Sequence, residues 1–215
     1  MIDPFIYSGS TLAAYLLGSV PFGFIVAKAH GVDIRTVGSG NIGATNVFRS
    51  ISKGWGLFTF ACDFLKGLLP VLLFPMVAGR LGFAGSADGL RLLCGMGAIA
   101  GHNWPVFLRF KGGKGVATST GAVLGIAPAA VGIGLVIWLV SFLALRYVSL
   151  ASMLAALTLA IGAWIMGPIR SHASPLVPVA LSVMAILIVA RHHANIRRLL
   201  AGTENRFNFK KDKTA

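Results

Sequence analysis

Residues 116–147 read VATSTGAVLGIAPAAVGIGLVIWLVSFLALRY, and no charged side chain occurs in them before Arg146. A helix that crosses a bilayer needs about 20 consecutive apolar residues, and similar apolar runs recur along the chain. Only helices and closed barrels satisfy all their backbone hydrogen bonds in lipid. The sequence therefore predicts an all-α fold, a polytopic bundle of transmembrane helices.

The composition supports a membrane protein. Hydrophobic residues make up 56% of the 215 residues and charged residues only 12%, against about 25% charged residues in an average soluble domain. The mean hydropathy is +0.80. Since the sequence shows no low-complexity segment and no clear internal repeat, we expect residues 1–215 to form a single integral membrane domain.

The apolar runs place about seven spans, at residues 6–28, 55–79, 90–108, 116–129, 131–147, 149–167 and 175–191. The region 116–147 leaves a choice between one tilted helix and two short helices broken at Ala127-Pro128. Two helices put nearly all Lys and Arg residues on one side, whereas one helix would move the basic tail to the other side. The positive-inside rule thus favours seven spans, with the N-terminus outside and the C-terminus in the cytoplasm.

The chain carries 19 Lys and Arg residues against 6 Asp and Glu residues, a net charge of +13. On a soluble protein this excess would suggest nucleic-acid binding. In a membrane protein basic residues flank the spans and set the topology, so no nucleic-acid partner is expected. Topology does not explain why Gly, Asn, Thr and His residues cluster with the basic ones in the predicted inner segments 31–54, 109–118 and 191–209.

The first inner segment contains GSGNIGATNVFR at residues 38–49, preceded by the strand-like Val32-Asp33-Ile34-Arg35. Its G-x-G-x-x-G pattern does not indicate a dinucleotide site, because a membrane span follows where a βαβ unit is required. Glycines still allow the backbone to approach an anion closely. The segment also offers neutral donors and a guanidinium, on Ser39, Asn41, Thr45, Asn46 and Arg49. A polar turn at the membrane surface is the plainer alternative, but we favour a phosphate site.

The second inner segment reads GHNWPVFLRFKGGKGVAT at residues 101–118. It is not a P-loop, because Val116 follows Gly115 where that motif requires Lys and then Ser or Thr. Lys111 and Lys114 nevertheless lie among glycines at the start of a predicted helix, which indicates a generic anion site. Flanking charge explains the lysines but not the glycines. His102 lies near the end of an apolar span, where ionisable groups are costly and usually functional.

Two further groups allow more than one interpretation. Asp63 and Lys66 share a helix face and are expected to form an internal ion pair; contact of Lys66 with a substrate phosphate is the weaker alternative. In the tail, RHHANIRRLLAGTE at residues 191–204, His192 and Asn195 share a helix face. An amphipathic helix on anionic lipid would explain the arginines of the tail better than it would explain His192 and Asn195.

Ser149 and Ser152 are either site residues or packing hydroxyls.

The blocks 39–49, 101–118 and 192–204, in this order, resemble the bacterial acyl-phosphate:glycerol-3-phosphate acyltransferases, the PlsY family. The resemblance covers essentially the whole chain. It implies a seven-helix protein of the bacterial inner membrane with its active site facing the cytoplasm. It also implies an enzyme that transfers a fatty acyl group from acyl phosphate to glycerol 3-phosphate, giving lysophosphatidic acid for phospholipid synthesis. Its expected partners are these two substrates and membrane lipid, and no cofactor or metal is expected.

The resemblance also implies roles for individual residues. Ser39, Arg49 and Lys114 are expected to bind the phosphate of glycerol 3-phosphate. The other expected substrate-binding residues are Asn41, Thr45, Asn46, His102, Lys111, Gly113, Ser149, His192 and Asn195. The expected catalytic residues are Arg49, Lys114, His192 and Asn195. Gly202-Thr203-Glu204 matches the third block and is expected to be partly structural.

The sequence leaves two possible proton acceptors and two rival functions open. The acceptor of the hydroxyl proton is either the phosphate of the donor or His192, because histidine is the residue type suited to proton transfer near neutral pH. None of the five histidines is followed five residues later by Asp, so the His-x4-Asp pair of another glycerophosphate acyltransferase family is absent. The rival functions are a transporter or binding protein for an organic phosphate, and an acyltransferase that uses a thioester donor.

Overall fold

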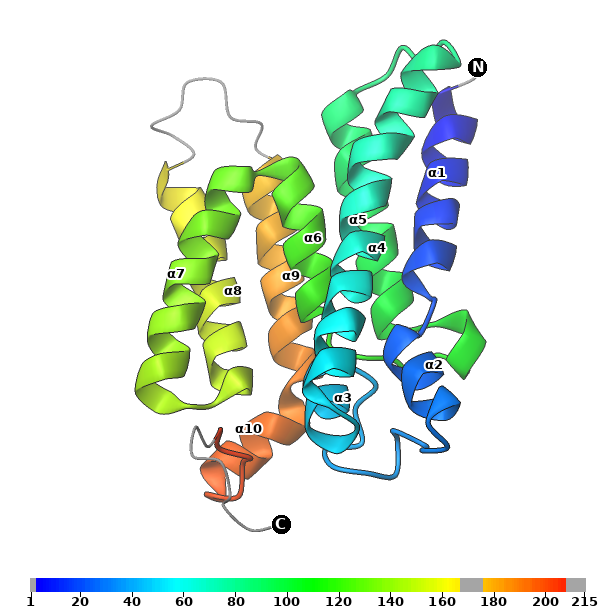
Figure 1. The fold of residues 1–215 in the computed structure, drawn as a ribbon. Coiled ribbons are helices and arrows are strands. Elements are labelled where there is room, and N and C mark those ends of the chain that lie inside the picture. The colour runs from blue at the N-terminus through cyan, green and yellow to red at the C-terminus, as the bar shows by residue number, and fades with distance from the viewer. Residues whose placement is uncertain (1–2, 167–175, 208–215) are drawn as a thin grey trace. The chain divides into compact units, whose positions relative to one another are not determined.

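The computed structural model describes residues 3–166 and 176–207, and every regular element in these residues is a helix (Figure 1). The all-α prediction is therefore confirmed. Contacts within the chain define two compact units, one ending at Ala129 and the other beginning at Ala130. The organisation as a single membrane domain stays a prediction, and the two units are described separately.

The first unit is built around one long helix. Its elements are α1 (Asp3–Gly18), α2 (Phe22–Ala29), α3 (Ala44–Ser50), α4 (Lys53–Arg80), α5 (Ala87–Asn103), the 3-10 helix η1 (Val106–Leu108) and α6 (Val116–Ile126). Helices α5 and α6 both pack on α4, and α1 packs on α5. Because α4 and α5 run in opposite directions, the segments 30–52 and 104–115 lie at the same end of this unit (Figure 1).

Glycines set the close spacing of these helices. A Cβ atom at Gly121 of α6 would lie 2.0 Å from the carbonyl oxygen of Phe64, and one at Gly67 of α4 would lie 2.1 Å from that of Thr118. Side chains larger than hydrogen would push α4 and α6 apart. Helices α4 and α6 therefore meet through small residues, as is common between membrane helices.

The predicted span 6–28 is not one continuous helix. It is interrupted between α1 and α2, at Ser19, Val20 and Pro21. Proline has no backbone N–H and cannot continue the hydrogen-bond ladder. The carbonyl oxygen of Val20 instead accepts a hydrogen bond from the Lys66 ammonium of α4, at 2.8 Å. A buried cation thereby satisfies a backbone group that the break leaves outside the helix ladder.

Two other breaks fall at prolines. The predicted span 90–108 ends as an α-helix at Asn103, because Trp104 precedes Pro105 and adopts a non-helical conformation. Between α6 and α7 the break lies at Ala127-Pro128, and Pro128 begins the next helix. The choice of two helices over one in the region 116–147 is confirmed.

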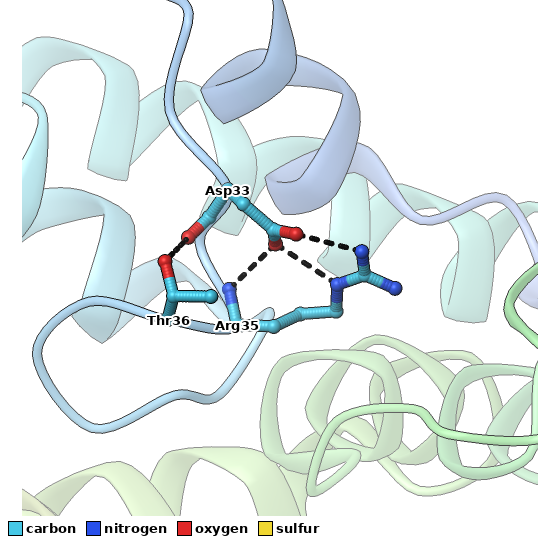
Figure 2. Close-up of polar contacts among 3 residues, drawn as sticks. All are labelled: Asp33, Arg35 and Thr36. Atoms are coloured by element: carbon cyan, nitrogen blue, oxygen red, sulfur yellow. Dashed lines mark hydrogen bonds and ion pairs between the residues drawn. The ribbon is translucent and has the colours of Figure 1, made fainter.

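The segment before the first glycine-rich block is a turn rather than the strand that its pattern suggested (Figure 2). Asp33 accepts hydrogen bonds from the backbone N–H of Arg35 at 3.0 Å and from its guanidinium at 2.9 and 2.7 Å. Thr36 donates its hydroxyl proton to the Asp33 carbonyl at 3.0 Å. The bonds and charge of Arg35 hold the pKa of Asp33 at about 2, so the turn keeps this ion pair at neutral pH.

The second unit contains α7 (Pro128–Leu145), α8 (Val148–Met166), α9 (Leu176–Arg191) and α10 (His193–Leu200). Helices α8 and α9 pack together, and the axis bends by 57° between α9 and α10. The tail returns to the turn between α7 and α8, where the Phe207 N–H donates to the Arg146 carbonyl at 2.8 Å. The expected loop 168–174 and the basic residues beyond 207 lie outside the described residues.

Several helices are suited to a bilayer. By length and composition, the segment Asp3–Ala29, made of α1 and α2, and the helices Lys53–Arg80, Pro128–Leu145 and Val148–Ile165 can each cross a membrane, and the bent pair α9–α10 would make a fifth span. Large apolar side chains are exposed along α4 and α7, as lipid-facing surfaces require. Helix α6 has 11 residues and at 1.5 Å per residue is about 16 Å long, shorter than the hydrocarbon core. The count of seven spans and the orientation of the termini stay predictions.

Candidate active site

The first glycine-rich loop is folded around one buried amide. The side chain of Asn46, 3% exposed, donates from Nδ2 to three carbonyl oxygens, those of Ile34 at 3.1 Å, Val37 at 3.0 Å and Asn41 at 2.9 Å. Its Oδ1 accepts from the backbone N–H of Ser39 at 3.0 Å. Asn46 therefore determines the course of residues 34–41.

The remaining residues of this block are presented by the folded loop and by α3. The Asn41 side chain accepts from the Gly43 N–H at 2.8 Å, a local turn that precedes α3. Gly38 and Gly40 have positive φ values of 57° and 69°, a conformation that favours glycine. Thr45 and Arg49 lie on α3 with exposed side chains.

The second loop, residues 104–115, is supported by the end of α5. The His102 carbonyl accepts a hydrogen bond from the Gly113 N–H at 3.0 Å. A Cβ atom at Gly113 would lie 2.1 Å from His102 Nε2, so the imidazole ring lies directly against the glycine backbone. Gly115, with φ of 78°, caps the start of α6. Lys111 is exposed and Lys114, between the two glycines, is partly exposed.

The two loops of the first unit share a hydrophobic cluster. Leu108 of η1 packs against the buried side chains of Val26, Ile34, Ile42 and Val47. The first unit thus gathers nine of the expected site residues at one end, from the first loop with α3 and from the end of α5 with the second loop: Ser39, Asn41, Thr45, Asn46 and Arg49, and His102, Lys111, Gly113 and Lys114. This arrangement joins cationic side chains, hydroxyls and glycine backbone in one region.

The expected ion pair of α4 is also in the first unit. The Lys66 ammonium lies 2.8 Å from Asp63 Oδ1, and both side chains are almost completely buried. The ammonium also lies 5.6 Å from the ring centroid of Phe22. Its contacts with Asp63, Val20 and Phe22 agree with the structural interpretation of Lys66.

In the second unit, one carboxylate connects two of the expected site residues. Glu204 Oε1 accepts from the Ser149 hydroxyl at 2.7 Å and from the Asn195 amide at 2.6 Å, and Oε2 accepts from Arg198 Nε at 2.7 Å. The sequence placed Glu204 in a recognised block, but its partners are separated from it by as many as 55 residues. No local pattern could have identified this network.

His192 lies at the bend between α9 and α10 and is 2% exposed. Its Nδ1 lies 2.7 Å from the carbonyl oxygen of Ile188. A carbonyl can only accept, so Nδ1 carries the proton. In the neutral ring, Nε2 then holds the lone pair that a general base requires. Ser152 bonds to the Val148 carbonyl and accepts from Trp138 Nε1, which agrees with a packing role.

The network around Glu204 gives a pH prediction. Burial alone would raise the pKa of Glu204, but the bonds from Asn195, Ser149 and Arg198 outweigh it and lower the pKa below the ordinary value of 4.5. A carboxylate with a lowered folded pKa stabilises the protein above its unfolded pKa, and this contribution is lost as the pH falls through the folded pKa.

We therefore expect Glu204→Ala to lower the free energy of unfolding by about 1–3 kcal/mol at pH 7, because three donors lose their acceptor. Thermal unfolding in detergent, from pH 7 to pH 4, measures it. The difference in the free energy of unfolding between wild type and Glu204→Ala should shrink as the pH falls below 4.5. The neighbouring exposed Thr203→Ala is the control and should change little. An equal difference at both pH values would contradict the assigned role of the carboxylate charge.

Comparisons with known proteins show which family this chain resembles. The family model of glycerol-3-phosphate acyltransferase matches residues 9–202. A protein of Trichlorobacter lovleyi named glycerol-3-phosphate acyltransferase is 44% identical over 194 residues, which are 90% of this chain and 94% of the relative. One of Geobacter metallireducens with the same name is 49% identical over 197 residues, 90% of this chain and 94% of the relative.

Two solved structures are also similar. Both are crystal structures of PlsY (YgiH), described as an integral membrane glycerol 3-phosphate acyltransferase. The glycerol 3-phosphate form has a TM-score of 0.82 and 40% identity, covering 94% of this chain and 96% of that chain. The lysophosphatidic acid form has a TM-score of 0.79 and 39% identity, covering 94% and 95%. With the membrane helices and polar loops described above, these matches show that the chain belongs to the glycerol-3-phosphate acyltransferase family of integral membrane enzymes.

Proposed function

We propose that this chain transfers a fatty acyl group from acyl phosphate to glycerol 3-phosphate and releases lysophosphatidic acid and inorganic phosphate. The observation that carries the proposal is the meeting of two loops at one end of the first unit. Arg49 lies on α3 directly after the first loop, and Lys111 and Lys114 lie among the glycines of the second loop. The similar PlsY structures, which are described as glycerol 3-phosphate and lysophosphatidic acid forms, support the acceptor and the product.

Both reactants carry phosphate, so the site must hold two anions side by side. We infer that Arg49 and Lys114 hold the phosphate of glycerol 3-phosphate, with Ser39 as a neutral donor. Guanidinium binds phosphate through two parallel N–H bonds, whereas ammonium acts as a point charge. In a site partly closed to water these interactions are stronger than in bulk solvent. Ser149, His192 and Asn195 are proposed to act in the same reaction.

The chemistry is a single acyl transfer. A hydroxyl oxygen of glycerol 3-phosphate attacks the acyl carbon and forms the ester bond. The bond between that carbon and the phosphate oxygen breaks, and phosphate leaves with the electron pair. The hydroxyl proton passes either to the leaving phosphate or to Nε2 of His192. Because the donor is already activated, positioning supplies most of the acceleration.

The donor is tested by assaying the purified protein with glycerol 3-phosphate and either acyl phosphate or acyl thioester. Release of lysophosphatidic acid and phosphate with acyl phosphate alone would support the proposal. Turnover with the thioester would instead assign a thioester-dependent acyltransferase. If neither donor reacted while vesicles containing the protein took up glycerol 3-phosphate, a transporter would replace the enzyme. A transporter places its substrate near the bilayer midplane, whereas the loops of the first unit lie at its end.

We also propose that the protein lies in the bacterial inner membrane, with seven spans and the basic loops in the cytoplasm. The break at Ala127-Pro128 supports this number, because it allows α6 and α7 to act as separate spans. A fluorescent protein that matures only in the cytoplasm, fused to the C-terminus, should therefore fluoresce. A dark fusion that accumulates to the same level, together with a periplasmic reporter that is active at this position, would favour six spans.

A further inference from the structure

Three ionisable side chains lie together in the interior of the first unit. Asp63 and Lys66 come from α4 and His102 from α5, and their side chains are 3%, 2% and 5% exposed. The Asp63 carboxylate lies 2.8 Å from the Lys66 ammonium and 3.6 Å from His102 Nδ1. Charged groups inside a membrane protein are costly to bury. Lys66 has a structural partner in Val20, but that contact does not explain why the carboxylate also faces His102.

His102 connects this group to the second loop. One side of the residue faces Asp63, through Nδ1. The other side supports the loop backbone: the carbonyl accepts from the Gly113 N–H at 3.0 Å, and Nε2 is 2.1 Å from the Cβ position of Gly113. A Cβ atom at Gly112 would similarly lie 2.2 Å from the His102 carbonyl oxygen. A small displacement of the His102 ring would therefore move the glycine backbone.

The loop has little freedom to absorb such a movement. The Asn103 side chain lies against its far end, where Oδ1 would be 2.7 Å from a Cβ atom at Gly115, and Gly115 has a φ of 78°. Lys114 lies between the two supported glycines. Arg109 and Phe110 before them have φ values of 51° and 63°, a left-handed conformation that is strained for residues other than glycine. The surrounding residues thus restrict the backbone of this loop to one conformation.

We propose that Asp63 is a positioning residue, which orients His102 and through it fixes the Gly113 backbone and the place of Lys114. The inference rests on the proposed function, in which Lys114 binds the phosphate of glycerol 3-phosphate. Asp63 touches no substrate in this scheme. Its removal should therefore weaken the binding of glycerol 3-phosphate selectively and leave the acyl donor little affected.

The test compares the kinetic constants of Asp63→Asn, His102→Gln and the double variant, all in detergent. In Asp63→Asn the KM for glycerol 3-phosphate is expected to rise about tenfold, since a misplaced binding group loses its alignment. The KM for acyl phosphate should stay within about twofold of wild type. Because both residues act on the same loop, the KM of the double variant for glycerol 3-phosphate should not exceed the higher KM of the two single variants.

The matched control is Asp88→Asn. Asp88 forms an ion pair of the same spacing with Arg91, at 2.8 Å, but on the exposed face of α5. This variant should keep all wild-type constants. Additive effects of Asp63→Asn and His102→Gln would overturn the proposal. So would a fall in the folded fraction with an unchanged KM, because that result would mean that Asp63 only stabilises the bundle.

If Asp63→Asn does not accumulate in membranes, Asp63→Glu decides the question. This variant keeps the charge beside Lys66 but moves the carboxylate by one methylene. A raised KM for glycerol 3-phosphate in the folded variant would support the positioning role, and an unchanged KM would overturn it. An inactive wild-type protein would instead refute the proposed function, so the two failures are distinguishable.

Discussion

Replacement of Arg49 by alanine is expected to lower kcat/KM for glycerol 3-phosphate by about 100-fold or more, while the protein still folds in the membrane. Charge-assisted hydrogen bonds are worth about 1.5–3 kcal/mol each, and a guanidinium can form two of them with one phosphate. The Arg49 side chain is exposed on α3, so its loss creates no buried cavity. The effect should thus appear in catalysis rather than in stability.

Two further variants sharpen this test. Arg49→Lys keeps the charge but not the planar fork, and we expect an intermediate loss. Arg35→Ala is the matched control, because Arg35 is an exposed arginine of the same inner segment, and its guanidinium forms an ion pair with Asp33 at 2.7 Å (Figure 2). It should keep most of the activity. Steady-state kinetics and thermal unfolding of the purified variants provide the measurements. Full turnover by Arg49→Ala would end the assignment of Arg49 as a phosphate ligand.

The sequence predicted most helices because membrane insertion imposes a strong and local pattern. The span expected at 55–79 is α4, Lys53–Arg80, and the span expected at 131–147 is α7, Pro128–Leu145. Proline made the break at Ala127-Pro128 predictable. The break at Pro21 was missed, because the apolar run continues through it, and its stabilising contact comes from Lys66, 46 residues away.

The polar segments were harder to predict because their structure depends on single contacts. Val32-Asp33-Ile34-Arg35 alternates like a strand, but no partner strand exists in the described residues, and the Asp33–Arg35 bonds close a turn instead. The sequence predicted Asn46 to be a neutral hydrogen-bond donor in the first glycine-rich segment. It could not show that one amide holds the carbonyls of Ile34, Val37 and Asn41.

Replacement of Asn46 by aspartate is the second variant for which we expect a large loss of activity. Asn46→Asp changes one side-chain NH₂ into an oxygen at nearly constant volume, so three backbone carbonyls would face an acceptor instead of a donor. A buried polar group that loses its partner costs about 1–3 kcal/mol, and here three lose it at once. We expect the course of residues 34–41 to be lost and the activity to fall by about 100-fold or more, because the loop no longer presents Ser39.

Trypsin provides a direct readout of the loop, since it cleaves after Arg35. Asn46→Asp should be cut there much faster than wild type, while the helices of the first unit resist. Ser50→Ala is the graded control. It removes only the weakest contact of the Asn46 side chain, at 3.3 Å, and should keep its activity within about twofold of wild type, as the loss of one such bond predicts. If Asn46→Asp kept both wild-type turnover and wild-type resistance to trypsin, the loop would not depend on this amide. The phosphate site would then have to be held by contacts other than those of Asn46.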